Sequence, residues 1–347
     1  MMKKLALILS LCLGLIACQY SVQQENTKEG TNDSIAASGD RALLLKQLND
    51  SIAMDTLNAA LYLRRARLYV ENEQVGQAMI DVNKSMSLDA KNVEAYLLLS
   101  DLYYLLGDEA NINTTLNRAA EIDPFDVRPL VKLAELNLLR QDFKLANAYI
   151  DKALGINTYN PKAYFVRGML NLARTDTVEA LKNYMTAREQ DARFFDPVRQ
   201  ICMIYVAQKN PLAESFLRNA VQQFPDEDII RYDLAMFLQD EIDPETALLH
   251  YDTLLMHQPG NSRLYFNKGY AYFVGLGDNE KALEYFDKAI QSDPNYVDAL
   301  YNKGRVLEQM GNYSEAKRIY QQVLSVSENY RLAIDALNRI GDVSAQE

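Results

Sequence analysis

The chain has 347 residues, of which 48% are hydrophobic and 24% are charged, a balance that is ordinary for a folded protein. Its formal net charge is −11, and because so acidic a surface repels phosphates we expect no nucleic-acid partner. Twenty-two tyrosines, no tryptophan and only 14 glycines favour helices packed by aromatic side chains over a loop-rich fold.

The first 17 residues have the pattern of a secretory signal peptide. Two lysines precede an apolar run over residues 5–16, which is about half the ~20 residues needed to cross a bilayer. The run ends in LIAC at residues 15–18 and resembles the lipobox of bacterial lipoproteins. The resemblance implies that the leader is cut before Cys18, which is then lipidated. An ordinary signal peptide cut nearby is the alternative.

Gln19 follows this cysteine, where an aspartate in similar lipoproteins indicates retention in the inner membrane. We therefore expect an outer-membrane lipoprotein, whose body faces the periplasm or the cell surface. Two or more acyl chains hold a protein firmly at a membrane. Residues 18–40 are rich in Gln, Asn, Ser, Thr and Glu, a composition that predicts a flexible tether behind the lipid.

A repeated pattern of small and aromatic residues extends from residue 59 to residue 330. Within residues 262–296, Gly269 and Tyr272 are followed by Ala282, Phe286 and Pro294. These positions resemble those of the tetratricopeptide repeat (TPR) family. The same frame can be laid eight times, as units 59–92, 93–126, 127–160, 161–194, 195–227, 228–261, 262–296 and 297–330.

The eighth residue of every unit is small, because the two helices of a hairpin cross there at close approach. The fifth unit is one residue short and the seventh one residue long, and we expect both changes at the turn between the two helices. The resemblance implies an all-α, right-handed superhelix of about eight hairpins, with capping helices in residues 41–58 and 331–347. The small residues are Ala66, Ser100, Ala134, Gly168, Cys202, Ala235, Gly269 and Gly304.

Side chains for catalysis or metal binding are few. The only histidines, His250 and His257, are seven positions apart, whereas metal sites use closer pairs and more ligands. Cys202 occupies a small site and is expected to be a buried, inert thiol. The acidic cluster of residues 226–228 lacks the spaced oxygen ligands of a calcium loop. We therefore expect no enzyme, no cofactor and no metal.

The concave wall of a TPR superhelix is lined by the second, fifth, ninth and twelfth residues of each first helix. In the middle and late units these positions carry apolar side chains with arginines beside them, which predicts a binding groove for a protein or an extended peptide. Burial by a tightly closed superhelix, or by a second copy, is the alternative. The expected groove residues are Phe165, Met169, Leu172, Arg199, Met203, Tyr232, Met236, Arg263, Phe266, Tyr270, Phe273, Tyr301 and Arg305.

These features predict a non-catalytic scaffold or adaptor that holds a protein partner in envelope assembly or secretion. A surface lipoprotein that binds nutrients or glycans is the main alternative. Such proteins stack sugars on tryptophan, and this chain has none. A zinc hydrolase that uses His250 and His257 is a third reading.

Overall fold

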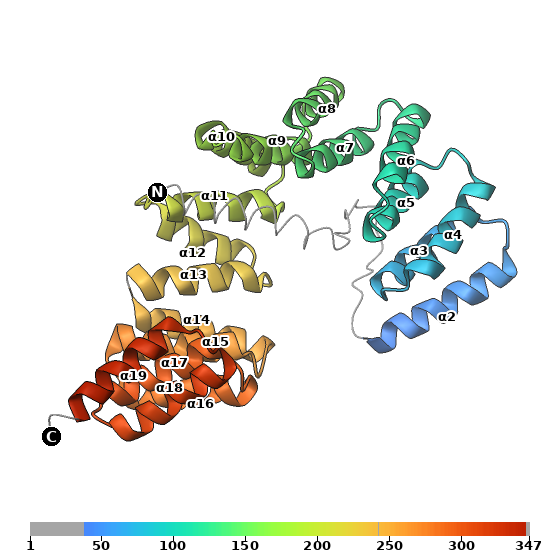
Figure 1. Ribbon diagram of the computed structural model, residues 1–347. Coiled ribbons are helices and arrows are strands. Elements are labelled where there is room, and N and C mark those ends of the chain that lie inside the picture. Colours follow the sequence, from blue (N-terminus) through green and yellow to red (C-terminus); the bar gives the residue numbers. More distant parts are fainter. Residues whose placement is uncertain (1–37, 242, 345–347) are drawn as a thin grey trace. The chain divides into compact units, whose positions relative to one another are not determined.

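The computed structural model describes residues 38–241 and 243–344, and all regular secondary structure within them is helical (Figure 1). The predicted signal peptide, Cys18 and the tether up to residue 37 lie outside these residues. Residues 38–40, which the sequence predicts as tether, belong to the first described helix. No helix among the described residues has the length and apolar character needed to span a membrane.

The chain divides into two compact units. Unit 1 extends to Pro197 and unit 2 starts at Val198, so the division falls within one helix. The helices that begin in unit 1 are α2 (Ser38–Met54), α3 (Ala59–Glu71), α4 (Val75–Leu88), α5 (Val93–Leu105), α6 (Glu109–Ile122), α7 (Arg128–Leu139), α8 (Phe143–Ile156), α9 (Pro161–Ala173), α10 (Thr177–Gln190) and α11 (Phe195–Ala207).

Unit 2 continues with further helices and one π-helical turn, η1. These elements are α12 (Ala213–Gln223), α13 (Asp228–Glu241), α14 (Pro244–His257), α15 (Ser262–Tyr270), η1 (Ala271–Leu276), α16 (Asn279–Ser292), α17 (Val297–Gln309), α18 (Tyr313–Val326) and α19 (Arg331–Ser344).

Consecutive helices pair as hairpins within each unit, which confirms the predicted all-α array. In unit 1, α3 packs on α4, α5 on α6, α7 on α8 and α9 on α10. In unit 2, α13 packs on α14, α15 on α16 and α17 on α18. The first helices of these pairs begin at the starts expected from the sequence, except that α7 begins at Arg128 rather than Val127. At the two ends, α2 packs on α3 and α19 on α18.

Among the described residues, seven turns inside hairpins place a residue in the left-handed region, and five second helices begin after a capping aspartate. The left-handed residue ends the first helix, and the aspartate side chain then accepts a hydrogen bond from a backbone N–H in the first turn of the second helix. The left-handed residues include Glu73, Gly107, Gln141, Thr175, Lys209, Gly277 and Gly311. The capping aspartates are Asp108, Asp142, Asp176, Asp243 and Asp278.

Three small residues of the first helices, Gly168, Gly269 and Gly304, lie directly under aromatic rings of the second helices. A Cβ atom built on Gly304 would lie 2.5 Å from the Tyr320 ring, and one on Gly269 would lie 2.7 Å from the Phe286 ring. Both rings are fully buried. The expected close crossing of the two helices is therefore present. The group that contacts each glycine is the aromatic ring of the second helix, not the alanine four residues before it.

The extra residue of the seventh unit lies inside its first helix. The sequence places this insertion at the turn between the helices, and that prediction is wrong. The end of this helix widens into η1, which takes up one residue in a π-helical turn before Gly277, at φ 67°, ends it. A Cβ on Gly275 would lie 2.6 Å from Pro244, so η1 also packs closely against the start of α14.

Candidate partner-binding face

The groove residues expected in unit 1 are mostly buried. Phe165 is 4% exposed and Leu172 is 7% exposed, whereas Met169 on the same helix is half-buried. The Phe165 ring lies edge-on to Phe194, with ring centroids 5.2 Å apart. Packing within unit 1 therefore accounts for Phe165 and Leu172, and the expectation that they are open to a partner is corrected.

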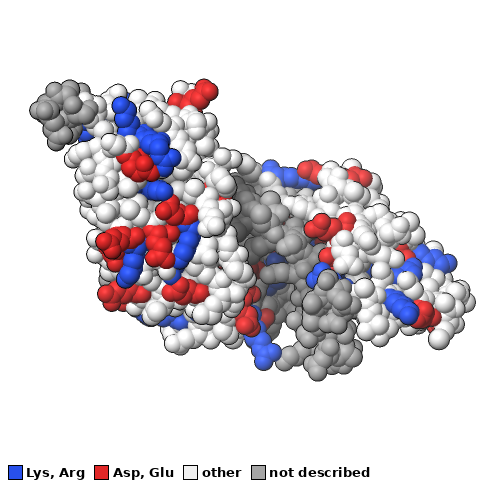
Figure 2. Space-filling model, turned by 90° about the horizontal axis from the view of Figure 1, so that it is seen from below, with Lys and Arg blue, Asp and Glu red and all other residues white. Residues whose placement is uncertain are grey.

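Charged side chains on the first helices of unit 1 pair with one another from repeat to repeat. Glu94 accepts hydrogen bonds from Arg67, at 2.5 Å, and from Arg128, at 2.6 Å. Asp101 accepts from Lys132 of the next repeat at 2.7 Å. Figure 2 shows one face of the molecule, on which positive and negative side chains lie next to each other over helices of both units. The paired charges on the first helices of unit 1 neutralise one another, so they leave little unpaired charge for a ligand to neutralise.

Arg199, at the start of unit 2, is held inside the fold. Its Nε atom lies 2.7 Å from a carboxylate oxygen of Asp233, and the Arg199 side chain is 7% exposed. Burial raises the pKa of Asp233, and the guanidinium opposes this shift. Arg199 is therefore a structural ion-pair partner rather than the expected contact for a ligand.

The next predicted residues, Met203, Tyr232 and Met236, are half-buried. Asn267 of α15 donates its Nδ2 hydrogen to the Tyr232 hydroxyl at 3.0 Å. The Tyr251 hydroxyl donates to the Met236 sulfur at 3.2 Å. Tyr232 therefore links its hairpin to the next one, whereas the Met236–Tyr251 contact lies within one hairpin, and both residues still present part of their surface.

Four predicted residues follow one another at helical spacing on α15 and η1: Arg263, Phe266, Tyr270 and Phe273. The Phe266 ring contacts Tyr270, with centroids 6.2 Å apart, and Tyr296, with centroids 5.2 Å apart. Phe273 is 8% exposed, so it supports the face from below rather than contacting solvent broadly. Arg263 is exposed, and its side chain makes no ion pair or hydrogen bond with any described residue.

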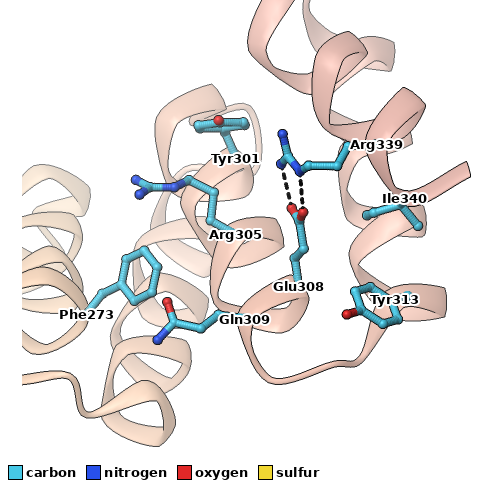
Figure 3. Close-up of a pocket in the computed structure, with 8 residues that line it drawn as sticks. All are labelled: Phe273, Tyr301, Arg305, Glu308, Gln309, Tyr313, Arg339 and Ile340. Atoms are coloured by element: carbon cyan, nitrogen blue, oxygen red, sulfur yellow. Dashed lines mark hydrogen bonds and ion pairs between the residues drawn. The ribbon is translucent and has the colours of Figure 1, made fainter. Parts of the chain in front are cut away.

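A pocket of about 420 Å³ adjoins this row (Figure 3). The Arg305 guanidinium lies over the Phe273 ring, 5.0 Å from its centroid, and donates to the Asn302 side-chain oxygen at 2.9 Å. No described carboxylate pairs with Arg305. The pocket is lined by Phe273, Tyr301, Arg305, Glu308, Gln309, Tyr313, Arg339 and Ile340.

Glu308 and Arg339 form the far side of this pocket. Arg339 donates to both Glu308 oxygens, at 2.7 and 2.9 Å, and the Tyr320 hydroxyl donates to Glu308 at 2.8 Å. The bonds from Arg339 are the main cause of a lowered Glu308 pKa. Figure 3 shows the Arg305 guanidinium turned away from this pair.

We call Arg263, Phe266, Tyr270, Phe273 and Arg305 the arginine–aromatic strip.

Several pocket residues were not expected from the sequence. Arg339 and Ile340 belong to α19, which the sequence predicts only as a polar cap. Arg339 follows Arg305 by 34 positions (339 − 305), so extending the repeat frame into residues 331–347 would have placed it on the same wall. Glu308 already stands at the twelfth position of its unit.

The other chemistry-bearing side chains form no reactive group. His257 Nδ1 lies 2.7 Å from an Asp228 oxygen, and Cys202 is fully buried. His250 has a lowered pKa, because it is partly buried and lies near two arginines. Among the described residues, no cluster of histidine, cysteine and acidic side chains has the form of a metal site.

Models of the tetratricopeptide repeat match residues 93–126, 232–297 and 273–340. An uncharacterized protein of Methanocaldococcus jannaschii is 46% identical over 66 residues, which cover 19% of this chain and 74% of that protein. The chain belongs to the tetratricopeptide-repeat family.

Two further comparisons agree with this family. The Hsp70-Hsp90 organizing protein of Triticum aestivum is 29% identical over 121 residues, so the TPR chain spans only 20% of that protein. The C-terminal part of a TPR repeat-containing protein from Cytophaga hutchinsonii has a TM-score of 0.59 at 16% identity. That match covers 69% of this chain and 98% of the other, and it concerns the fold alone.

Proposed function

We propose that this TPR protein is a non-catalytic scaffold whose unit 2 holds a protein segment on the arginine–aromatic strip. TPR arrays generally serve as protein-binding scaffolds, and the strip is the surface on which we propose that this one binds its partner. The observation that carries the proposal is an exposed Arg263 and a half-buried Tyr270 next to a pocket whose Arg305 has no carboxylate partner among the described residues. Aromatic and arginine side chains are the groups that most often anchor protein interfaces.

Unit 2 is a better candidate than unit 1 for physical reasons. The charges on the first helices of unit 1 are already paired across repeats, as in Arg67–Glu94–Arg128. A ligand there would have to displace hydrogen bonds that the chain makes with itself. On the strip, a ligand would gain contacts that nothing in the described chain supplies, and binding would cost less desolvation of paired groups.

We further propose that the TPR body works at the outer membrane, tethered by lipid on Cys18. The LIAC sequence at residues 15–18 and the polar composition of the residues that follow support this part of the proposal. The partner would then be a component of envelope assembly or secretion that comes within reach of the tether.

The binding face is tested by crosslinking in cells that make the protein. A photoreactive phenylalanine analogue at Tyr270 is expected to capture a discrete partner band on illumination. The same analogue at Leu249, which is 67% exposed on the second helix of a neighbouring hairpin, serves as the matched control. Equal capture at both positions, or none at Tyr270, would contradict the proposed face.

A further inference from the structure

Arg263 and Arg305, like Arg231 and Arg331, form no ion pair with a described carboxylate, whereas several other arginines of unit 2 do. Arg199, Arg318 and Arg339 each bind a carboxylate of the chain, at 2.7, 2.5 and 2.7 Å respectively. Arg263 and Arg305 bind none among the described residues, and both stand on the same row of side chains. Charge complementarity therefore points to a ligand that brings its own carboxylates.

The Arg305 side chain is already held in a binding orientation. The Phe273 ring beneath it and the bond to Asn302 hold the guanidinium, while only one of its five N–H donors is used in that bond. The pocket holds two arginines, Arg305 and Arg339, and one acid, Glu308. Because Glu308 is neutralised by Arg339, one positive charge is left over. A carboxylate placed there would restore neutrality at little cost in ordering the side chain.

The overall charge of −11 does not prevent this. At physiological ionic strength, charges farther away than about 8 Å are largely screened. The uncompensated guanidinium and the aromatic faces beside it therefore dominate what a bound segment experiences.

The length of the strip sets the spacing of the carboxylates. Arg263 and Phe273 are ten positions apart (273 − 263) on a continuous helical segment, which corresponds to about 15 Å at about 1.5 Å per residue. An extended peptide covers this distance in about five residues, at about 3.3 Å each. Tyr270 lies between the two ends and offers a surface for an apolar side chain.

We propose that the arginine–aromatic strip recognises an extended acidic segment of the partner protein. Two Asp or Glu side chains about five residues apart pair with Arg263 and Arg305, and an apolar or aromatic side chain between them packs on Tyr270. A terminal carboxylate could serve only one of the two guanidinium groups, so the structure favours an internal segment. This inference rests on the proposed function and specifies the chemistry of its ligand.

The test is selection from a displayed library of random twelve-residue peptides against the full-length protein. The peptides are fused at both ends, so that they carry no free terminal carboxylate. Wild-type protein is expected to enrich peptides with two acidic residues four to six positions apart and an apolar residue between them. The double variant Arg263→Gln, Arg305→Gln is expected to lose that acidic preference.

The most enriched peptide is then synthesised with blocked ends and its affinity is measured by fluorescence anisotropy. Arg263→Gln and Arg305→Gln are each expected to weaken binding about tenfold, as loss of a charge-assisted bond does. Changing the matching glutamate of the peptide to glutamine should give the same loss, with no further loss when both changes are combined. The double variant Arg318→Gln, Arg331→Gln removes the same charge from α18 and α19 and should bind normally.

The outcomes separate this inference from the proposed function. Enriched peptides without acidic residues, bound equally by the Arg263→Gln, Arg305→Gln variant, would overturn the inference and leave peptide binding intact. Selection only from a second library with free C-termini would replace it with recognition of a terminal carboxylate. No enrichment at all, together with no capture at Tyr270, would refute both.

Discussion

Among the residues that the structure describes, four other than glycine occupy the left-handed position that ends the first helix of a hairpin: Glu73, Gln141, Thr175 and Lys209. In this region the Cβ atom of an L-residue approaches the neighbouring carbonyl oxygen, which costs about 1–2 kcal/mol. The cost is highest for Thr175, at φ 66°, because a β-branched side chain is rarely tolerated there. The hairpin tolerates it because the adjacent Asp176 caps the following helix.

Thr175→Gly is therefore expected to stabilise the protein. Removing the strained side chain should raise the free energy of unfolding by about 1 kcal/mol, minus the added chain entropy of glycine. Urea denaturation followed by circular dichroism measures the change. The converse variant, Gly311→Ala at φ 77°, should lower the stability by a similar amount. A loss of stability in Thr175→Gly would show that the hydroxyl contributes more than the strain costs.

Residue identity predicted the close helix crossings but not which groove residues are open. Gly304 under Tyr320 follows from the small-residue period, because few side chains fit where two helix backbones approach. The burial of Phe165 depends on Phe194, a residue 29 positions away (194 − 165) whose ring fills the space beside it. Both residues belong to the fourth unit, at its fifth and thirty-fourth positions, but the frame assigns each position separately and does not say that these two side chains meet. The aspartate caps, by contrast, recur at 34-residue spacing from Asp108 to Asp176 and could have been found.

At the scale of elements, α19 packs on the last hairpin of the array through one ion pair and one row of apolar side chains. Ala333, Ala336 and Ile340 are buried against α18, and Arg339 binds Glu308 of α17. The sequence predicted a solvating final helix, and its apolar side follows from period-3.6 spacing. The Arg339–Glu308 pair was not predicted, since a charged residue near a chain end is ordinarily read as solvent-exposed.

The Glu308–Arg339 pair predicts a pH dependence. The pKa of Glu308 is lower in the folded protein than in the unfolded chain. The ion pair therefore stabilises the fold fully at pH values above the ordinary glutamate pKa, and this stabilisation is lost as the pH falls through the folded-state pKa of Glu308. Arg339→Gln should cost about 0.5–1 kcal/mol at pH 7, because Arg339 is 56% exposed. The difference from wild type should shrink as the pH is lowered through the acidic range in which Glu308 becomes protonated, in urea titrations at several pH values. A difference that stays constant with pH would contradict this account.

At the scale of the whole molecule, the repeats are unequal although they share one frame. In unit 1, charged side chains of the first helices pair between repeats, whereas unit 2 has an aromatic face with two arginines, Arg263 and Arg305, that pair with no described carboxylate. Hairpin architecture and approximate repeat boundaries could be predicted, because each depends on spacing alone. The division of the chain at Pro197 could not, since it depends on how well successive hairpins pack.

The proposed tether also belongs to this scale. Cys18→Ala should move the TPR body from the membrane fraction to the soluble fraction almost completely, because lipid supplies all of the proposed attachment. Circular dichroism should be unchanged, and labelling with an alkyne-tagged fatty acid should disappear. Cys202→Ala, which removes a buried thiol, is the control and should stay with the membrane. A Cys18→Ala protein that stays membrane-bound would rule out the lipid tether.

The π-helical turn η1 limits how freely the seventh hairpin can be exchanged. A 34-residue module that carried the same strip residues and Gly275 would still lack the residue that η1 accommodates. Side chains beyond that point would rotate by about a quarter-turn or more around the helix axis, carrying Phe273 away from Arg305 and Gly275 away from Pro244. Engineering by repeat shuffling would therefore preserve the hairpin and erase its ligand preference, and only a donor with the same extra residue would keep both.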